Sequence, residues 1–138
     1  MLNENQNSIN NQTDLDCLNG VKVIDLSQYE AGPSCTEALA WLGAEVVKIE
    51  KPVTGEPARY GYARISDDKD SWYFCQFNAN KKSITLDLKS NKGIEILKEL
   101  VKRADVFIEN LAPGTIERLG LSFEALASLN PKLVYAQV

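Results

Sequence analysis

The sequence has 138 residues, 44% hydrophobic and 25% charged, which is ordinary for one globular domain with a buried core. Fifteen basic and 19 acidic residues give a net charge of −4, and no basic block is long enough to neutralise a run of phosphates, so nucleic acid is not an expected partner. The lack of histidine excludes a Ser-His or Cys-His nucleophile and a histidine-ligated metal site within these residues.

The three cysteines, Cys17, Cys35 and Cys75, are odd in number and widely spaced. This spacing predicts neither a disulfide framework nor a zinc site, and it favours a reducing, cytoplasmic location. The Asn- and Gln-rich start lacks the basic and apolar segments of a signal peptide. No apolar run is long enough to span a bilayer, so we expect no membrane association.

Residues 1–17 have almost no apolar periodicity, and we expect a flexible polar tail ahead of a domain at residues 18–138. The β-branched run Val21–Leu26 predicts a buried strand. After Pro33, apolar residues recur at helical spacing up to Gly43, and they are Cys35, Ala38, Leu39 and Leu42.

Glu45–Glu50 predicts a second strand, which completes a strand-helix-strand unit with parallel strands. Lys51–Lys82 breaks the pattern with prolines, glycines and charges, and predicts an irregular, exposed excursion. A cluster of aromatic residues is expected to anchor this excursion to the core, and it consists of Trp72, Tyr73, Phe74 and Phe77.

Ser83–Leu88 predicts the next strand, and Ser90 is a candidate N-cap for the helix that follows. That helix carries one apolar stripe, formed by Ile94, Leu97, Leu100, Val101 and Ala104. The remaining elements are a strand at Asp105–Glu109, a turn at Pro113–Gly114, a short helix at Ser122–Leu129 that stops at Asn130–Pro131, and a strand at Leu133–Val138.

Alternating strands and helices predict a Rossmann-like α/β fold, with an open, mostly parallel sheet and helices on both faces. Such sheets bind ligands beyond the carboxyl ends of their strands. The strand-end segments here are Ser27–Gly32, Lys51–Pro52, Lys89 and Asn110–Pro113. Because the sequence stops inside a predicted strand, we expect the fold to be incomplete at the C-terminus and the isolated chain to fold poorly.

Each polar motif also has a structural interpretation. The loop Ser27–Pro33 leads into a helix N-terminus, where an anion is favoured, but it lacks the G-x-G-x-x-G of a dinucleotide site. For Glu50 with Lys51 we prefer a solvated charge pair at a strand end, and for Asn78–Ser83 a solvated turn is a good interpretation. Glu117 and Arg118 join the strand-end polar residues near one crevice, although scattered surface residues would look similar.

In their joint order, several segments resemble the class III CoA-transferases. They are Leu18–Val21, Val23–Leu26, Ala31–Thr36, Leu42–Ala44, Val47–Glu50, Asp70–Phe74, Asn78–Leu88, Ala104–Val106, Glu109–Asn110 and Pro113–Gly114. The resemblance is collinear from Leu18 to Val138 and identifies residues 18–138 as the amino-terminal part of a CoA-binding Rossmann-like domain.

The resemblance implies a substrate, coenzyme A or acyl-CoA, rather than a tightly bound cofactor, and a small carboxylic acid as its co-substrate. It implies an interlocked homodimer for the full-length chain. It places CoA contacts on Glu30, Ala31, Lys51, Leu86, Asp87, Leu88, Lys89, Asn110, Leu111, Ala112 and Arg118. Lys51, Lys89 and Arg118 would meet phosphate oxygens.

Glu30 and Lys51 stand where a similar member of the family has glutamine and arginine. A carboxylate at Glu30 would repel one anionic acceptor acid or hydrogen-bond a different one.

The resemblance implies CoA transfer between an acyl-CoA thioester and a carboxylic acid, through a covalent aspartyl intermediate. It puts the nucleophilic aspartate beyond Val138, so no catalytic residue and no metal ligand is assigned in these residues, and the chain alone would be inactive. Asp25 and Asp105 lie in or beside strands, where we expect structural roles. The alternatives are an α-methylacyl-CoA racemase of the same fold and a non-catalytic CoA-binding module; the stretch from Asp70 to Lys82 favours transfer.

Overall fold

The computed structural model describes residues 16–61, 66 and 70–138. Most of the flexible tail predicted for residues 1–17 lies outside this part of the chain, and so do the charged residues 67–69 of the predicted excursion. The domain boundary at residue 18 stays a prediction.

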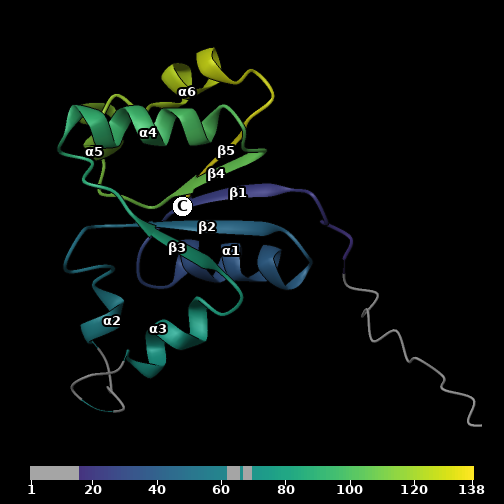
Figure 1. The fold of residues 1–138 in the computed structure, drawn as a ribbon, viewed down its shortest axis with the longest axis vertical. Helices are drawn as coiled ribbons and strands as arrows, with labels where there is room; N and C mark the ends of the chain where they lie inside the picture. Colours follow the sequence, from purple (N-terminus) through teal and green to yellow (C-terminus); the bar gives the residue numbers. More distant parts are fainter. Residues whose placement is uncertain (1–15, 62–65, 67–69) are drawn as a thin grey trace, which may run out of the picture.

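Strands and helices alternate over the described residues (Figure 1). The strands are β1 (Lys22–Leu26), β2 (Glu45–Glu50), β3 (Lys82–Thr85), β4 (Val106–Glu109) and β5 (Val134–Gln137). The helices are α1 (Ala31–Trp41), α2 (Ala58–Gly61), α3 (Trp72–Phe77), α4 (Asn91–Val101), α5 (Thr115–Arg118) and α6 (Phe123–Leu129).

The five strands form one open sheet in the order β3-β2-β1-β4-β5, and every pairing is parallel. Helices α1, α2 and α3 lie on one side of the sheet and α4, α5 and α6 on the other (Figure 1). This confirms the predicted α/β fold with an open parallel sheet. Among the described helices, none is both long and apolar enough to cross a membrane.

The two faces of the sheet carry separate apolar cores because successive strand side chains point to opposite sides. Val23 and Val46 pack with Ala40 of α1 on one face. On the other face, Ile24 and Phe107 pack with Leu97 of α4 in the larger cluster. The central strands are therefore fixed from both sides, which holds their carboxyl ends at one edge.

Helix α4 follows the prediction closely. The Ser90 hydroxyl accepts a hydrogen bond from Gly93 N at 3.0 Å, as an N-cap does. Leu97, Val101 and the following Ala104 are buried, and Ile94 and Leu100 are half-buried against them. The predicted apolar stripe is correct.

Helix α1 differs from the prediction in its start and in its buried face. It begins at Ala31 rather than after Pro33, and Cys35, Ala38 and Leu42 of the predicted stripe are exposed. The buried residues are Gly32, Pro33, Thr36 and Ala40. A Cβ on Gly32 would lie 2.2 Å from Ser27 Cβ, so small side chains allow this close approach to the sheet.

The excursion between β2 and β3 is less irregular than predicted, because it contains α2 and α3. Of the four aromatic residues expected to anchor it, Phe74 is buried, two are half-buried and Trp72 is 63% exposed. Phe74 is also covered by Arg59, whose guanidinium carbon lies 3.8 Å from the ring centroid. The anchor is thus one aromatic ring and a cation, with Trp72 outside it.

Three shorter segments also differ. The strand predicted at Ser83–Leu88 is Lys82–Thr85, and residues 86–88 lie beyond its carboxyl end. Helix α5 was not predicted, and it follows the expected turn at Pro113–Gly114. The strand predicted at Leu133–Val138 is Val134–Gln137, which pairs with β4 and is partly exposed because it lies at the edge of the described sheet.

Candidate functional site

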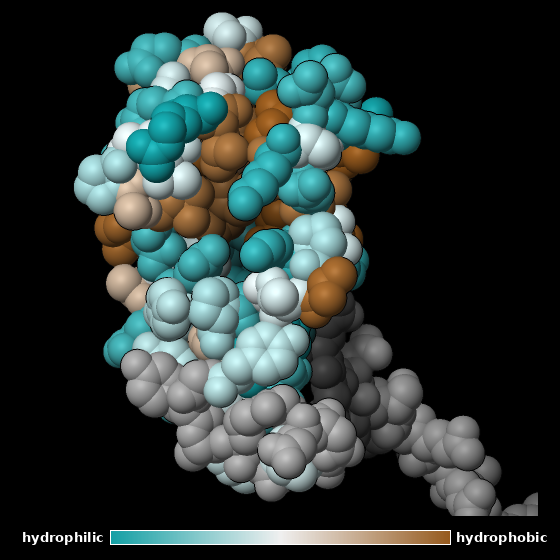
Figure 2. Space-filling model, turned by 90° about the vertical axis from the view of Figure 1, so that its left-hand side faces the viewer, coloured by the Kyte–Doolittle hydropathy of each residue, from teal (hydrophilic) through white to brown (hydrophobic). Residues whose placement is uncertain are grey.

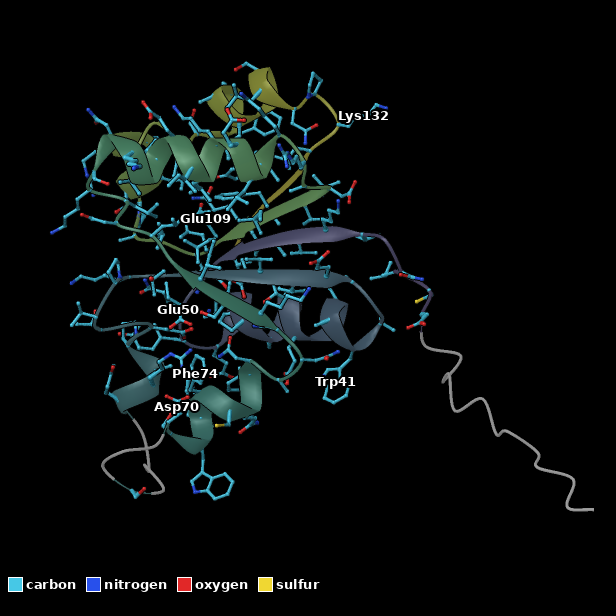
Figure 3. All side chains as sticks on the ribbon, in the orientation of Figure 1. Trp41, Glu50, Asp70, Phe74, Glu109 and Lys132 are labelled. Carbon is cyan, nitrogen blue, oxygen red and sulfur yellow. The ribbon has the colours of Figure 1, made fainter. Side chains whose placement is uncertain are left out.

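The carboxyl ends of all five parallel strands meet at one edge of the sheet. Figure 2 looks toward this edge and shows apolar residues in its upper half, bordered by hydrophilic ones. In Figure 3, Glu50 and Glu109 mark the ends of β2 and β4, while Trp41 and Lys132 lie toward the opposite edge. All eleven residues predicted to contact CoA lie on segments that follow a strand or on the helix after such a segment.

Three of these residues, Leu88, Lys89 and Arg118, line one open hollow of about 560 Å³. Lys98 of α4 adds a third basic side chain to it. The other lining residues are Ser90, Asn91, Ile94, Glu95 and Leu119. Three basic side chains and several apolar ones around a single hollow suit a ligand with phosphates and an apolar part, and Glu95 is the one carboxylate among them.

Lys98 was missed in the sequence, although a signal for it existed. It lies one helical turn after Ile94, a member of the apolar stripe of α4 that also lines the hollow, so helical spacing places both residues on the same side of the helix.

Lys51 does not join that group. It lines a second hollow of about 450 Å³ with Gln28, Thr54, Gly55, Pro57 and Tyr60. The predicted phosphate contacts are therefore divided between two hollows at the same edge.

Asn110 joins two strand-end segments. Its Oδ1 accepts from Gln28 N at 2.7 Å, and its Nδ2 donates to Gln28 O at 2.7 Å. Leu111 N in turn donates to the Glu109 carboxylate at 2.7 Å. These bonds fix the segment after β4 against the loop after β1.

Glu30 and Ala31 are exposed at the start of α1. The Glu30 carboxylate accepts a hydrogen bond from the Tyr73 hydroxyl at 3.0 Å. Leu86, Asp87 and Leu88 lie between β3 and α4, and Ala112 is exposed after β4.

Glu50 is not the solvated strand-end charge that the sequence suggested. It is 5% exposed and receives Arg59 Nε at 2.7 Å and Arg59 Nη2 at 2.6 Å. Burial would raise the pKa of Glu50, but hydrogen bonds from Arg59, Ser83 and the Glu56 N–H lower it to about 2. Arg59 also pairs with Asp70 at 2.7 Å, and Figure 3 shows Glu50, Phe74 and Asp70 on one side of the sheet. The carboxylate ties the excursion to β2.

Lys81 also contradicts the expectation of a solvated turn at Asn78–Ser83. Its side chain is 2% exposed, and Nζ donates to Asp25 Oδ2 at 3.1 Å and to the carbonyl oxygen of Pro33 at 2.9 Å. Burial would raise the pKa of Asp25, but Lys48, Lys81 and hydrogen bonds from Ser27 and Thr36 outweigh it, and the pKa is lowered. Burial lowers the pKa of Lys81.

Asp25 and Asp105 have the structural partners expected of them. Asp25 is fully buried and accepts hydrogen bonds from Thr36 Oγ1 at 2.6 Å and from the Ser27 N–H and hydroxyl. Asp105 Oδ2 accepts from Lys22 N at 2.8 Å, at the opposite edge of the sheet. Over the described residues, no group of three or more His, Cys, Asp or Glu is placed to hold a metal ion.

The sequence matches a known protein family and several named relatives. The family model described as CoA-transferase family III matches residues 18–138. A formyl-CoA:oxalate CoA-transferase of Afipia carboxidovorans is 47% identical over 121 residues, which are 88% of this chain and 28% of that protein. The enzyme of the same name from Streptomyces avermitilis is 47% identical over 88% of this chain and 29% of its own length.

Solved structures agree with the fold. A CAIB/BAIF family protein from Brucella suis matches with a TM-score of 0.82 at 36% identity, over 88% of this chain and 32% of the other. The Rv3272 protein from Mycobacterium tuberculosis matches with a TM-score of 0.79 at 40% identity, over 86% and 33%. The chain thus spans about 28–33% of the length of the relatives described.

Proposed function

This chain belongs to CoA-transferase family III, and from that premise we propose that its protein transfers coenzyme A from an acyl-CoA thioester to a carboxylic acid. The named relatives act on formyl-CoA and oxalate, and they are more than three times as long as the matched region. We propose that this chain acts as the amino-terminal, CoA-binding part of such an enzyme.

The observation that carries the proposal is the basic hollow at the carboxyl edge. Coenzyme A presents a pyrophosphate, a separate ribose phosphate and an apolar arm. Lys89, Lys98 and Arg118 would pair with the phosphates, and Arg118 offers a planar fork that fits two phosphate oxygens. The half-buried Leu88 and Ile94 in the same hollow would cover apolar parts of the ligand.

The remaining predicted contacts would extend the site along the same edge. Lys51 would meet a second anionic group from the neighbouring hollow. Leu86, Asp87, Leu111 and Ala112 would contact CoA through backbone and side chain, since each lies just after a strand. Asn110 would act chiefly by holding the loop after β1, because both ends of its amide are bonded to Gln28.

The chemistry would run through an aspartate outside residues 18–138. Its carboxylate would attack the thioester carbonyl and expel CoA as a thiolate, leaving a mixed anhydride. The thiolate would attack the aspartyl carbonyl of that anhydride, releasing the donor acid and forming aspartyl-CoA. The acceptor acid would then react with aspartyl-CoA in the same two steps reversed. Glu30, paired with the Tyr73 hydroxyl, would disfavour a strongly anionic acceptor beside it.

We further propose a cytoplasmic enzyme that works as an interlocked homodimer. The exposed, unpaired thiols of Cys17, Cys35 and Cys75 support a reducing compartment. The dimer is proposed from the family resemblance.

Replacing Arg118 with alanine in the full-length protein tests the site. We expect CoA affinity to fall by roughly 1.5 to 3 kcal/mol, the scale of a hydrogen bond between charged groups, which is about 10- to 150-fold in Kd. Isothermal titration with CoA measures this. The matched control is Arg103→Ala, an exposed arginine after α4 at the opposite edge, which should leave Kd unchanged. Equal affinity of wild type and Arg118→Ala would show that the hollow is not the CoA site.

A further inference from the structure

A buried charge cluster lies directly beneath the loop after β1 and is not used by the proposed ligand contacts. Its members are Asp25 of β1, Lys48 of β2, Glu56 of the β2–α2 segment and Lys81 before β3, whose side chains are all at most 2% exposed. Lys48 Nζ lies 2.5 Å from Glu56 Oε2 and 3.8 Å from Asp25 Oδ2.

Side chains from other segments hold the backbone of this loop at successive residues. Lys48 Nζ donates to Ser27 O at 2.8 Å. Asn110 bonds both the N–H and the carbonyl of Gln28. Glu56 Oε1 accepts from Tyr29 N at 2.7 Å. The loop that leads to Glu30 and α1 is therefore fixed by side chains and not by strand pairing.

Tyr29 is the residue where this support matters most. Its φ is 66°, in the left-handed region that a bulky residue rarely adopts. Such a conformation persists only where the surroundings determine it, and it is typical of ligand-binding loops. Glu56 supplies the bond at Tyr29 and is itself fixed, because its N–H donates to Glu50 Oε2 at 2.8 Å and Lys48 pairs with its carboxylate.

We propose that Glu56, oriented by Lys48, is a positioning residue that fixes the Tyr29 backbone and thereby sets Glu30 and the start of α1 for the CoA ligand. The inference rests on the proposed function for its ligand, but the geometry of the loop stands without it. A buried ion pair is in general no more stabilising than an apolar pair of similar volume. A gain in stability therefore does not explain why Lys48 and Glu56 are charged. A role in positioning the loop does explain it.

The test compares Glu56→Ala with Glu56→Gln in the full-length protein. Glutamine keeps an acceptor within reach of Tyr29 N, whereas alanine removes it. We expect hydrogen exchange at the Tyr29 amide to accelerate about tenfold or more in Glu56→Ala, with a Kd for CoA raised about tenfold. In Glu56→Gln the exchange rate at the Tyr29 amide and the Kd for CoA should both stay within about threefold of the wild-type values. Exchange in β1 at Ile24 and in β2 at Val46 should not change in either variant.

The double variant Lys48→Met, Glu56→Leu covers the case in which Glu56→Ala does not fold. This variant removes the charges of Lys48 and Glu56 but keeps the side-chain volume, so it should fold. It should still lose protection from hydrogen exchange at the Tyr29 amide, and its affinity for CoA should fall. Unchanged exchange at Tyr29 in the folded variants would overturn the inference, as would fast exchange with unaltered CoA affinity. If wild type itself bound no CoA, the proposed function would fail, while acceleration at Tyr29 would still support the role of Glu56 in fixing the loop.

Discussion

Val53 combines a fully exposed side chain with a strained backbone. It is 99% exposed, and its φ is 69°, a conformation that β-branched residues disfavour strongly. Glycine adopts this φ freely, and no packing is lost with the side chain. We expect Val53→Gly to stabilise the full-length protein by about 0.5 to 1 kcal/mol, after the entropy cost of glycine. The thermal unfolding midpoint measures it.

Val53→Ala is the matched control. Alanine keeps the Cβ that makes the left-handed region unfavourable, so its gain should be smaller than that of glycine. A lower midpoint for Val53→Gly than for wild type would contradict the backbone conformation at this position.

Single residues were the least predictable level. Lys81 lies in a polar run that is typical of a solvated turn, yet it pairs with Asp25, 56 residues earlier in the chain. Glu50 similarly pairs with Arg59, which lies in a segment that was expected to be irregular. No local pattern encodes such pairings, because they depend on how separate segments pack. Lys98 was missed as well, although helical spacing from Ile94 would have been enough to place it beside the predicted contacts.

Among the elements, β2 and the excursion that follows it are joined by a charge pair with a clear pH dependence. Glu50 of β2 has a pKa of about 2, against an ordinary value of 4.5, because of its bonds to Arg59, Ser83 and the Glu56 N–H. A carboxyl group whose pKa is lowered in the folded state stabilises the protein at pH values above its pKa in the unfolded chain. That contribution is lost as pH falls from 4.5 toward 2, and it amounts to about 3 kcal/mol.

Glu50→Gln should therefore be less stable than wild type at neutral pH, with a difference in unfolding free energy that shrinks below pH 4.5. Urea unfolding at pH 6 and at about pH 3 measures this. Glu99→Gln is the control, since Glu99 forms an exposed pair with Lys102, of a kind that contributes little. A difference between Glu50→Gln and wild type that is independent of pH would contradict the pairing. Asp25, whose pKa is also lowered, should leave part of the acid sensitivity in the variant.

The order of elements was predictable because apolar periodicity is a local signal. Helix α4 carries a clear stripe and a serine N-cap, and it was predicted correctly. Helix α1 was misread because its buried face consists of Gly32, Pro33, Thr36 and Ala40, and small or polar residues give no apolar stripe. The close contact with Ser27 that selects them is tertiary. Helix α5 is a single turn, too short to show periodicity.

For the molecule as a whole, topology predicted better than any motif which polar residues lie at one edge of the sheet. A parallel sheet brings its strand ends to one edge, so Lys89 after β3 and Arg118 in α5 meet although they are 29 positions apart in sequence. The sequence could not show that Lys51 faces a separate hollow, because this depends on the path of the segment after β2.

Binding of CoA along this edge should change the chemical reactivity of its lysines, which footprinting measures residue by residue. The full-length protein is acetylated with a water-soluble reagent in the presence and absence of CoA, and modification is measured at each lysine by mass spectrometry. Lys89 and Lys98 line the basic hollow. The exposed Lys132 lies toward the opposite edge (Figure 3), and the exposed Lys102 follows α4 on the connection that leads to the start of β4. We predict that CoA protects Lys89 and Lys98 severalfold and leaves Lys102 and Lys132 unchanged. Protection confined to other lysines, or no protection at saturating CoA, would show that CoA does not bind at this edge.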